Sequence, residues 1–323
     1  MRVFVTGGSG LLGGDLIRAL VARGDAVAAL ARSDAAARQV ARLGAEPIRG
    51  DLFSHDAIVH GARGAAVAFH VAGRNDTCPR DIAGLYRDNI DGAVAVVDAL
   101  AAAGVPRIVH TSSAAAIGEP AGVVADETTL PATFPSHYAR SKHRGERAAF
   151  AAADRAGIEL VAVLPSSVQG PGRSGGSAKL LIHALRSRRP LIVETALSIV
   201  DIDDCTAGHL AAADRGVAGR RYLLSGATAT ASHILSLIAE TTGRTIEPIT
   251  VPGTLLGLGT PLAAVIHRIA GASLVCPDLL RTLAHGHRFD AGRSQRELGV
   301  VYRPLTDTII RTVTWLRDEG LVD

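Results

Sequence analysis

The sequence predicts an α/β fold, with a doubly wound parallel sheet and a smaller α/β substrate domain interleaved with it. Three observations support this prediction. Short apolar runs alternate with helical patterns through the first half, a glycine-rich turn joins the first run to the first helix, and the alternation stops at Pro165. Strands that alternate with helices build parallel sheets, because each helix carries the chain back to the edge where the strand began.

The first unit contains the apolar run Val3–Val5 and then the glycine-rich segment Thr6–Gly13. Gly7 permits a tight turn, Gly10 has no side chain to hold a phosphate away, and Gly13 lets the helix pack against the strand. The N-terminus of the following helix offers free N–H donors and a positive dipole end. We therefore expect a dinucleotide pyrophosphate to bind at Gly7, Gly10, Leu11, Leu12 and Gly13.

The remaining elements follow the same alternation. Apolar runs predict strands at Val27–Leu30, Pro47–Arg49, Val67–Val71, Arg107–Thr111, Glu159–Leu164 and Arg221–Ser225. Helical patterns predict helices at about 12–31, 86–104 and 138–156. We expect residues 1–165 and about 201–226 to form the dinucleotide-binding domain, and about 166–200 and 227–323 to form the substrate-binding domain.

The composition predicts a folded chain that does not bind nucleic acid. The 323 residues are 47% hydrophobic and 20% charged, which is enough apolar material for a sizeable core. The net charge is only +3 and aromatic residues make up 3%, so the chain lacks a stacking platform for bases.

The cysteines and histidines predict neither a disulfide nor a metal. Cys78, Cys205 and Cys276 are odd in number and far apart, which favours a reducing cytoplasm and gives no disulfide framework. His285 and His287 are expected to be a surface or packing pair rather than a metal site. The chain begins with a predicted strand, which leaves no room for a signal peptide, and we expect a cytoplasmic protein.

The most apolar segment is Leu255–Val275. Glycines, a proline and charged residues interrupt it, so it is not expected to span a membrane. Its apolar positions have helical spacing, which is consistent both with the wall of an apolar pocket and with plain core packing.

Two chemically active side chains share one helix face. Tyr138 and Lys142 lie one helical turn apart, and a nearby cation can stabilise a phenolate so that tyrosine exchanges a proton near neutral pH. Ser113 follows a predicted strand, at the sheet edge where ligands bind in such folds. Ser113 could donate a hydrogen bond to the same substrate oxygen.

This combination resembles the extended branch of the short-chain dehydrogenase/reductase family, the NAD-dependent epimerase/dehydratase type. The glycine motif, Ser113 and the Tyr138-x-x-x-Lys142 pair all match. Further matches over essentially the whole chain are Gly50-Asp51-Leu52, His70–Gly73, Asn89 and Val200–Asp204. The resemblance implies a Rossmann-type sheet and a nicotinamide dinucleotide. It also implies a possible homodimer, built on the helices near 86–104 and 138–156.

The resemblance also implies roles for residues. Tyr138 would be the general acid/base, Ser113 would position the reacting oxygen, and Lys142 would bind the nicotinamide ribose and lower the pKa of the tyrosine. Asn89 would be structural. Further cofactor contacts would come from Asp51, Leu52, Val71, Ala72, Gly73, Thr111, Pro165, Ser167 and Val168.

The end of the second strand predicts the choice of cofactor. Enzymes selective for NAD place a carboxylate there for the ribose 2′-hydroxyl, but this chain has Ala31. Arg32 can pair with a 2′-phosphate and Ser33 can donate a second hydrogen bond. We therefore expect NADP(H).

The substrate prediction rests on departures from the pattern of nucleotide-sugar enzymes. Leu164 and Leu197 occupy positions where such enzymes carry arginines. The Pro165–Pro171 segment instead resembles the dihydroflavonol-reductase-like branch, which implies a ketone, aldehyde or secondary alcohol on an apolar small molecule. A sugar epimerase or 4-keto-sugar reductase is the alternative. A nucleotide-sensing regulator is disfavoured by the complete triad. Ser113, Arg74 and Arg173 are candidate substrate contacts.

Overall fold

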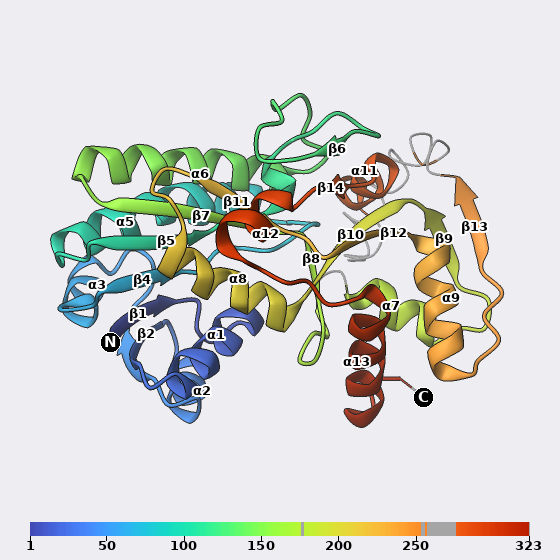
Figure 1. Cartoon of the computed structure of the whole chain (residues 1–323), viewed down its shortest axis with the longest axis horizontal. Coiled ribbons are helices and arrows are strands. Elements are labelled where there is room, and N and C mark those ends of the chain that lie inside the picture. The colour runs from blue at the N-terminus through green and yellow to red at the C-terminus, as the bar shows by residue number, and fades with distance from the viewer. Residues whose placement is uncertain (176–177, 253–255, 257–275, 323) are drawn as a thin grey trace.

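A seven-stranded parallel sheet forms the centre of the protein, in a computed structural model that describes residues 1–175, 178–252, 256 and 276–322 (Figure 1). The strand order is β11-β7-β5-β4-β1-β2-β3, and every neighbouring pair is parallel. All seven predicted strands are confirmed, at β1 Arg2–Thr6, β2 Ala26–Ala31, β3 Glu46–Arg49, β4 Val67–His70, β5 Arg107–Thr111, β7 Glu159–Pro165 and β11 Arg221–Leu224.

Helices cover both faces of this sheet, so the predicted doubly wound architecture is confirmed. One face packs against α1 (Leu11–Ala22), α2 (Asp34–Arg42), α8 (Ile202–Arg215) and α12 (Gly292–Leu298). The other packs against α3 (His55–Ala62), α5 (Gly92–Ala102) and α6 (His137–Ala156). Helices α5 and α6, which the resemblance places at a dimer interface, lie side by side (Figure 1).

Two predicted helix boundaries differ from the structure. The helix predicted at about 12–31 ends at Ala22, because Gly24 has a positive φ of 85° and turns the chain into β2. The helix predicted at about 86–104 is three elements, the short α4 (Ile82–Tyr86), a π-helical turn at Arg87–Asp91 and then α5. The helix predicted at 138–156 is confirmed as α6.

A second, smaller α/β part surrounds its own apolar cluster (Figure 1). Its strands are β8 (Ser167–Gln169), β10 (Ala196–Asp201) and β12 (Ala227–Thr230), with the pair β9 (Leu191–Glu194) and β13 (Ile249–Pro252). Its helices include α7 (Ala178–Leu185), α9 (Ala231–Thr242), α11 (Pro277–His285) and α13 (Leu305–Asp318).

Segments that the sequence assigns to the substrate-binding domain also pack against the large part. Strand β14 (Arg288–Phe289) pairs with β6 (Val124–Ala125), and Leu298 and Val300 pack in the core of the large sheet. The predicted domain boundaries therefore remain a prediction.

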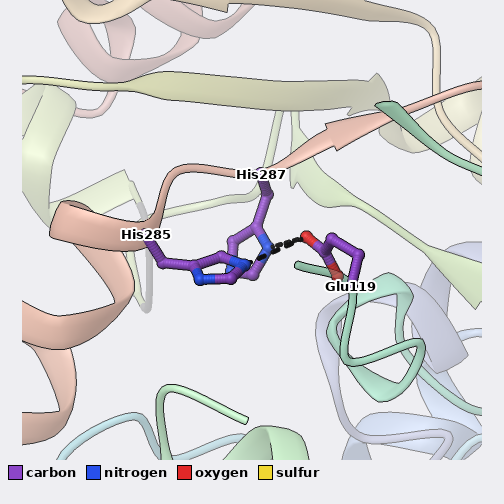
Figure 2. A group of neighbouring side chains, drawn as sticks. All are labelled: Glu119, His285 and His287. Carbon is purple, nitrogen blue, oxygen red and sulfur yellow. Dashed lines mark hydrogen bonds and ion pairs between the residues drawn. The ribbon is translucent and has the colours of Figure 1, made fainter. Parts of the chain in front are cut away.

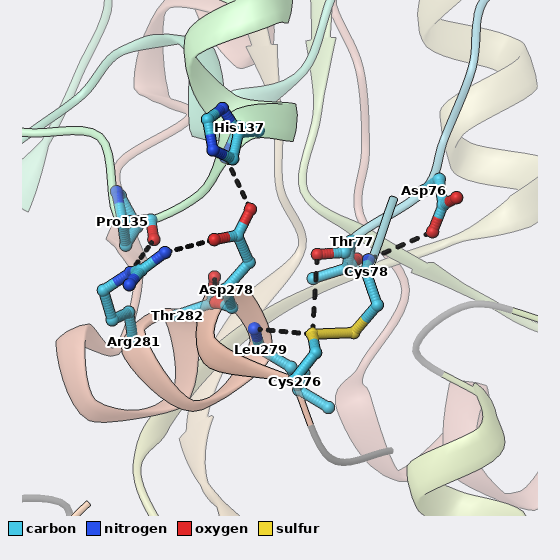
Figure 3. The surroundings of a disulfide bond; sticks show 10 residues. All are labelled: Asp76, Thr77, Cys78, Pro135, His137, Cys276, Asp278, Leu279, Arg281 and Thr282. Atoms are coloured by element: carbon cyan, nitrogen blue, oxygen red, sulfur yellow. Dashed lines mark hydrogen bonds and ion pairs between the residues drawn. A yellow bond between two sulfur atoms is a disulfide. The ribbon is translucent and has the colours of Figure 1, made fainter. Parts of the chain in front are cut away.

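The prediction of no disulfide is wrong. Cys78 and Cys276 are bonded, with an S–S distance of 1.97 Å, although they are 198 residues apart in sequence (Figure 3). The fold brings the loop after β4 against the first turn of α11, a contact that sequence spacing does not reveal. Cys205 is free and buried. The cysteines therefore no longer support the predicted reducing cytoplasm.

The predicted pocket or core helix at Leu255–Val275 lies outside the described residues, apart from residue 256. Across the ranges that the structure does describe, no helix combines the length and the apolar character needed to cross a bilayer.

Candidate active site

The glycine segment between β1 and α1 forms a tight cradle. Gly7 has a φ of 77°, and a Cβ there would lie 2.6 Å from the amide nitrogen of Ala72. A Cβ on Gly13 would overlap the Gly7 carbonyl. Gly10 caps α1 without a side-chain hydrogen bond, which leaves the first-turn N–H groups available. These donors, on Leu11, Leu12 and Gly13, fit the pyrophosphate of a dinucleotide.

The loop after β4 packs directly against the cradle. The Thr6 hydroxyl lies 2.7 Å from Nδ1 of His70 and accepts a hydrogen bond from the Ala72 amide at 3.2 Å. Burial lowers the pKa of His70 to about 3, so its imidazole is neutral. The structure thus brings Val71, Ala72 and Gly73 beside the glycine motif, as the sequence predicts.

Two arginines belong to the region around the end of β2: the predicted Arg32, directly after the strand, and Arg49 from the neighbouring β3. Arg32 and Ser33 are exposed directly after the strand, and Ser33 caps α2 by accepting a hydrogen bond from the Ala36 amide. Arg49, from β3, lies against the Ala31 carbonyl and forms an ion pair with Asp34 at 3.2 Å. The chain thus carries two arginines, Arg32 and Arg49, at the end of β2 or beside it.

The cofactor contacts predicted at Asp51 and Leu52 and those predicted at Pro165, Ser167 and Val168 occupy different strand ends. Asp51 accepts hydrogen bonds from the Phe53 amide and the Ser54 hydroxyl, which fixes the turn after β3, and Leu52 packs towards Gly92. Pro165 ends β7, and Ser167 and Val168 lie in β8, which pairs with β10. Both groups lie at carboxyl ends of strands or just beyond them, as the prediction requires.

Ser113, Tyr138 and Lys142 come together beside the end of β5. The Ser113 hydroxyl caps the short 3-10 helix Ala114–Ala116, and Tyr138 lies in the first turn of α6. The ammonium group of Lys142 donates to the Thr111 carbonyl at 2.7 Å. The Thr111 hydroxyl is in turn 3.0 Å from Nε2 of the buried His209.

The predicted lowering of the Tyr138 pKa by Lys142 stays a prediction. Burial raises the pKa of Tyr138, while a hydrogen bond with Ser113 and the positive charge of Arg173 lower it without offsetting burial. Lys142 directs its ammonium to the Thr111 carbonyl instead. Arg173 is therefore a cation that favours the phenolate in this structure.

The lowered pKa of Lys142 predicts how the rate of the reaction depends on pH. Burial lowers its pKa to about 8, and the nearby Glu146 carboxylate only partly opposes this. Because a protonated Lys142 would hold the ribose, we expect kcat/KM of the catalysed reaction to fall above pH 8. The rate profile should be measured between about pH 6 and pH 10. In Lys142→Arg the fall should move upward, since guanidinium stays charged throughout this range. An identical fall in both proteins would exclude Lys142 as its cause.

The two candidate substrate arginines differ in environment. Arg74 forms an ion pair with Asp81 at 3.0 Å, so its charge is already partnered. Arg173 is partly buried, its Nε has no hydrogen-bond partner, and its charge acts on Tyr138.

Asn89 holds the backbone of Arg74 by two hydrogen bonds. Its side-chain oxygen accepts a hydrogen bond from the Arg74 amide at 2.8 Å, and its side-chain nitrogen donates to the Arg74 carbonyl at 3.1 Å. Both bonds fit its predicted structural role.

Helix α11 holds the start of α6, where Tyr138 lies. The Asp278 carboxylate accepts a hydrogen bond from the His137 amide at 2.8 Å, and the Arg281 side chain donates one to the Pro135 carbonyl at 3.1 Å (Figure 3). The disulfide at Cys276 fixes the beginning of the same helix. The smaller part of the protein thus positions the tyrosine.

Sequence reasoning missed three polar groups at this edge. Arg49 is the first of them. It ends β3, the strand next to β2, and this position is a usable sequence signal for a cation near the 2′-phosphate. The hydroxyls of Ser112 and Ser166 are buried without a hydrogen-bond partner, at the ends of β5 and β7. Buried unpaired hydroxyls at a ligand-binding edge are free to bind a ligand.

A parallel sheet with a glycine cradle and a Ser-Tyr-Lys constellation at its carboxyl edge defines the class of extended short-chain dehydrogenase/reductases. The model of the NAD dependent epimerase/dehydratase family matches residues 3–225, and the chain belongs to this family. It is therefore an enzyme of a family that depends on a nicotinamide dinucleotide.

Named reductases are among its relatives. A Synechocystis sp. protein named after dihydroflavonol 4-reductase is 30% identical over 332 residues, which cover 99% of this chain and 95% of the relative. A 4-hydroxy-2-methyl-3-oxo-4-farnesyl-3,4-dihydroquinoline-1-oxide ketoreductase of Stigmatella aurantiaca is 35% identical over 78% of this chain and 76% of its own length. The solved structure of gox2253 has a TM-score of 0.87 at 27% identity, with 100% of this chain and 99% of that chain covered.

Proposed function

We propose that this protein is an NADP(H)-dependent oxidoreductase that reduces a ketone or aldehyde on an apolar small molecule, or oxidises the corresponding secondary alcohol. The observation that carries the proposal is the convergence of Ser113, Tyr138 and Lys142 beside the glycine cradle. Arg32 and Arg49 support the phosphorylated cofactor, because both cations lie at the end of β2 or beside it.

Tyr138, Ser113 and Arg173 have different roles in the proposed reduction. When bound, the nicotinamide supplies the hydride that the carbonyl carbon receives. Tyr138 donates its phenolic proton to the carbonyl oxygen, and its raised pKa keeps it protonated at neutral pH for this step. Ser113 hydrogen-bonds the same oxygen as negative charge develops there. Arg173 limits the cost of the phenolate that the transfer leaves behind.

Apolar surroundings support the proposed substrate class. Leu197, at the position where nucleotide-sugar enzymes carry an arginine, packs against the apolar cluster of the smaller part. A leucine cannot neutralise a diphosphate. The farnesyl-bearing ketone in the name of the Stigmatella relative is a substrate of the proposed kind.

Consumption of NADPH by the purified protein tests the proposal. The panel should pair lipophilic ketones and aldehydes with nucleotide-linked 4-keto sugars, and the cofactor content of the purified protein should be measured. Turnover of the lipophilic carbonyls is expected. Turnover of nucleotide sugars alone, or retained cofactor without net reduction, would overturn the proposal in favour of an epimerase or 4-keto-sugar reductase.

Arg173→Met is expected to lower kcat and to raise the KM of the carbonyl substrate about tenfold, because it removes a cation that favours the Tyr138 phenolate and a charge-assisted hydrogen bond that contributes about 1.5–3 kcal/mol. The affinity for NADPH, measured by fluorescence titration, should stay the same. Arg189→Met removes an exposed arginine of the smaller part and serves as the control. If NADPH affinity falls while KM does not rise, Arg173 holds the cofactor rather than the substrate.

A further inference from the structure

A carboxylate and two imidazoles from separate segments of the chain converge on one another (Figure 2). Glu119 lies in the loop that leaves Ser113, His285 ends α11, and His287 precedes β14. One ligand atom from each residue lies within 4.8 Å of the others. Nδ1 of His287 is 2.6 Å from Oε1 of Glu119, and Nε2 of His285 is 3.6 Å from the same oxygen.

An ion pair between Glu119 and the histidines leaves two buried polar atoms of this cluster without a hydrogen bond. The Glu119 side chain is only 1% exposed and that of His285 is 7% exposed. Oε2 of Glu119 and Nε2 of His285 are both buried without a hydrogen-bond partner. Buried polar atoms that lack partners are costly, and most native proteins pair them with protein, water or an ion. The unpaired atoms belong to two adjacent members of one cluster, which is consistent with a shared ligand between them.

The donor set identifies the class of that ligand. Imidazole nitrogens combined with one carboxylate favour zinc and related transition metals, whereas magnesium and calcium prefer sites made of oxygen atoms. The His287 ring is held by stacking on Phe289, with ring centroids 5.6 Å apart. A zinc ion needs ligand distances of about 2.0–2.2 Å, which small side-chain rotations of Glu119 and His285 could provide.

We propose that Glu119, His285 and His287 form a binding site for a divalent transition metal of the zinc type, with its remaining coordination position open to water. On binding, the Glu119 carboxylate and the two imidazole nitrogens form bonds to the metal, and the proton between His287 and Glu119 leaves to solvent. The metal would clamp the Glu119 loop to the segment between α11 and β14. The pairing of β14 with β6 lies directly beyond this clamp.

Metal titration of the full-length, disulfide-bonded protein tests the site. Protein without a histidine tag is stripped with a chelator, freed of it, and titrated with Zn²⁺ or Co²⁺. One equivalent should bind, Co²⁺ should show the visible absorption of a low-coordinate site, and the melting temperature should rise with metal concentration. Glu119→Gln and His285→Gln should each weaken binding at least tenfold. Mg²⁺ should produce none of these changes.

His233→Gln is the matched control, because it removes an exposed histidine from α9 in the smaller part. Its metal affinity should equal that of the unsubstituted protein. The proposal is overturned if the unsubstituted protein binds no zinc at about 100 μM, or if both site variants bind it unchanged. If a site variant does not fold, the Co²⁺ titration of the unsubstituted protein still decides, since absence of binding there is sufficient to reject the site.

Discussion

Tyr138→Phe is expected to lower kcat for carbonyl reduction by roughly 10²–10⁴-fold, the usual range for loss of a general acid. The phenol is the group that the structure places beside Ser113, and phenylalanine keeps the ring that packs in the first turn of α6. The dissociation constant of NADPH should stay within about twofold, because the substitution removes a transition-state interaction rather than a binding contact.

The chain supplies a closely matched control for this variant. Tyr86 is also partly buried, and its hydroxyl lies 3.3 Å from Nδ1 of His137, the residue before Tyr138. Tyr86→Phe should leave kcat nearly unchanged. A comparable loss in both variants, or a Tyr138→Phe protein that loses NADPH binding together with turnover, would exclude Tyr138 as the acid.

Arg32→Asp is expected to reverse the cofactor preference. Loss of one charge-assisted bond to the 2′-phosphate contributes about 1.5–3 kcal/mol, and the new carboxylate both repels the phosphate and can accept the 2′-hydroxyl of NAD. The ratio of kcat/KM for NADPH to that for NADH should therefore fall roughly 100-fold. Initial rates with each cofactor at constant ionic strength measure the ratio.

Arg38→Asp makes the same charge change on α2 at another exposed position and should leave the ratio unchanged. Arg49→Ala should lower the ratio less than Arg32→Asp, because its guanidinium also pairs with Asp34. A preference for NADPH that survives Arg32→Asp but is lost in Arg49→Ala would transfer the role to Arg49.

The parallel sheet could be predicted from the sequence because its signals are local. Most of its strands are short apolar runs, and the glycine spacing at Gly7, Gly10 and Gly13 is tied to one turn. Gly10 and Gly13 are required by contacts with the nearby Gly7 carbonyl, and Gly7 by contacts with the loop after β4, which is why the motif and the cradle agree. Helix ends were less predictable, as the early stop at Ala22 shows.

What could not be predicted depends on contacts between segments far apart in the chain. Glu119 and His287 are 168 residues apart, so the sequence shows only a histidine pair where the structure shows three potential ligands. A charge that acts on Tyr138 comes from Arg173 in the loop after β8, whereas the sequence pattern points to the lysine one turn away. Spacing along a helix predicts which side chains share a face but not which of them turns towards a given atom.

The Cys78–Cys276 bond also acts on the denatured state. It closes a ring of chain that contains Ser113, Tyr138, Lys142 and Arg173, so every member of the reacting constellation is tethered even when the protein is unfolded. The loop-entropy relation applied to a separation of 198 residues gives about 5 kcal/mol of destabilisation of that unfolded ensemble. Protein handled with a thiol reductant and protein handled without one are thus two covalent forms, which begin refolding from ensembles of different breadth.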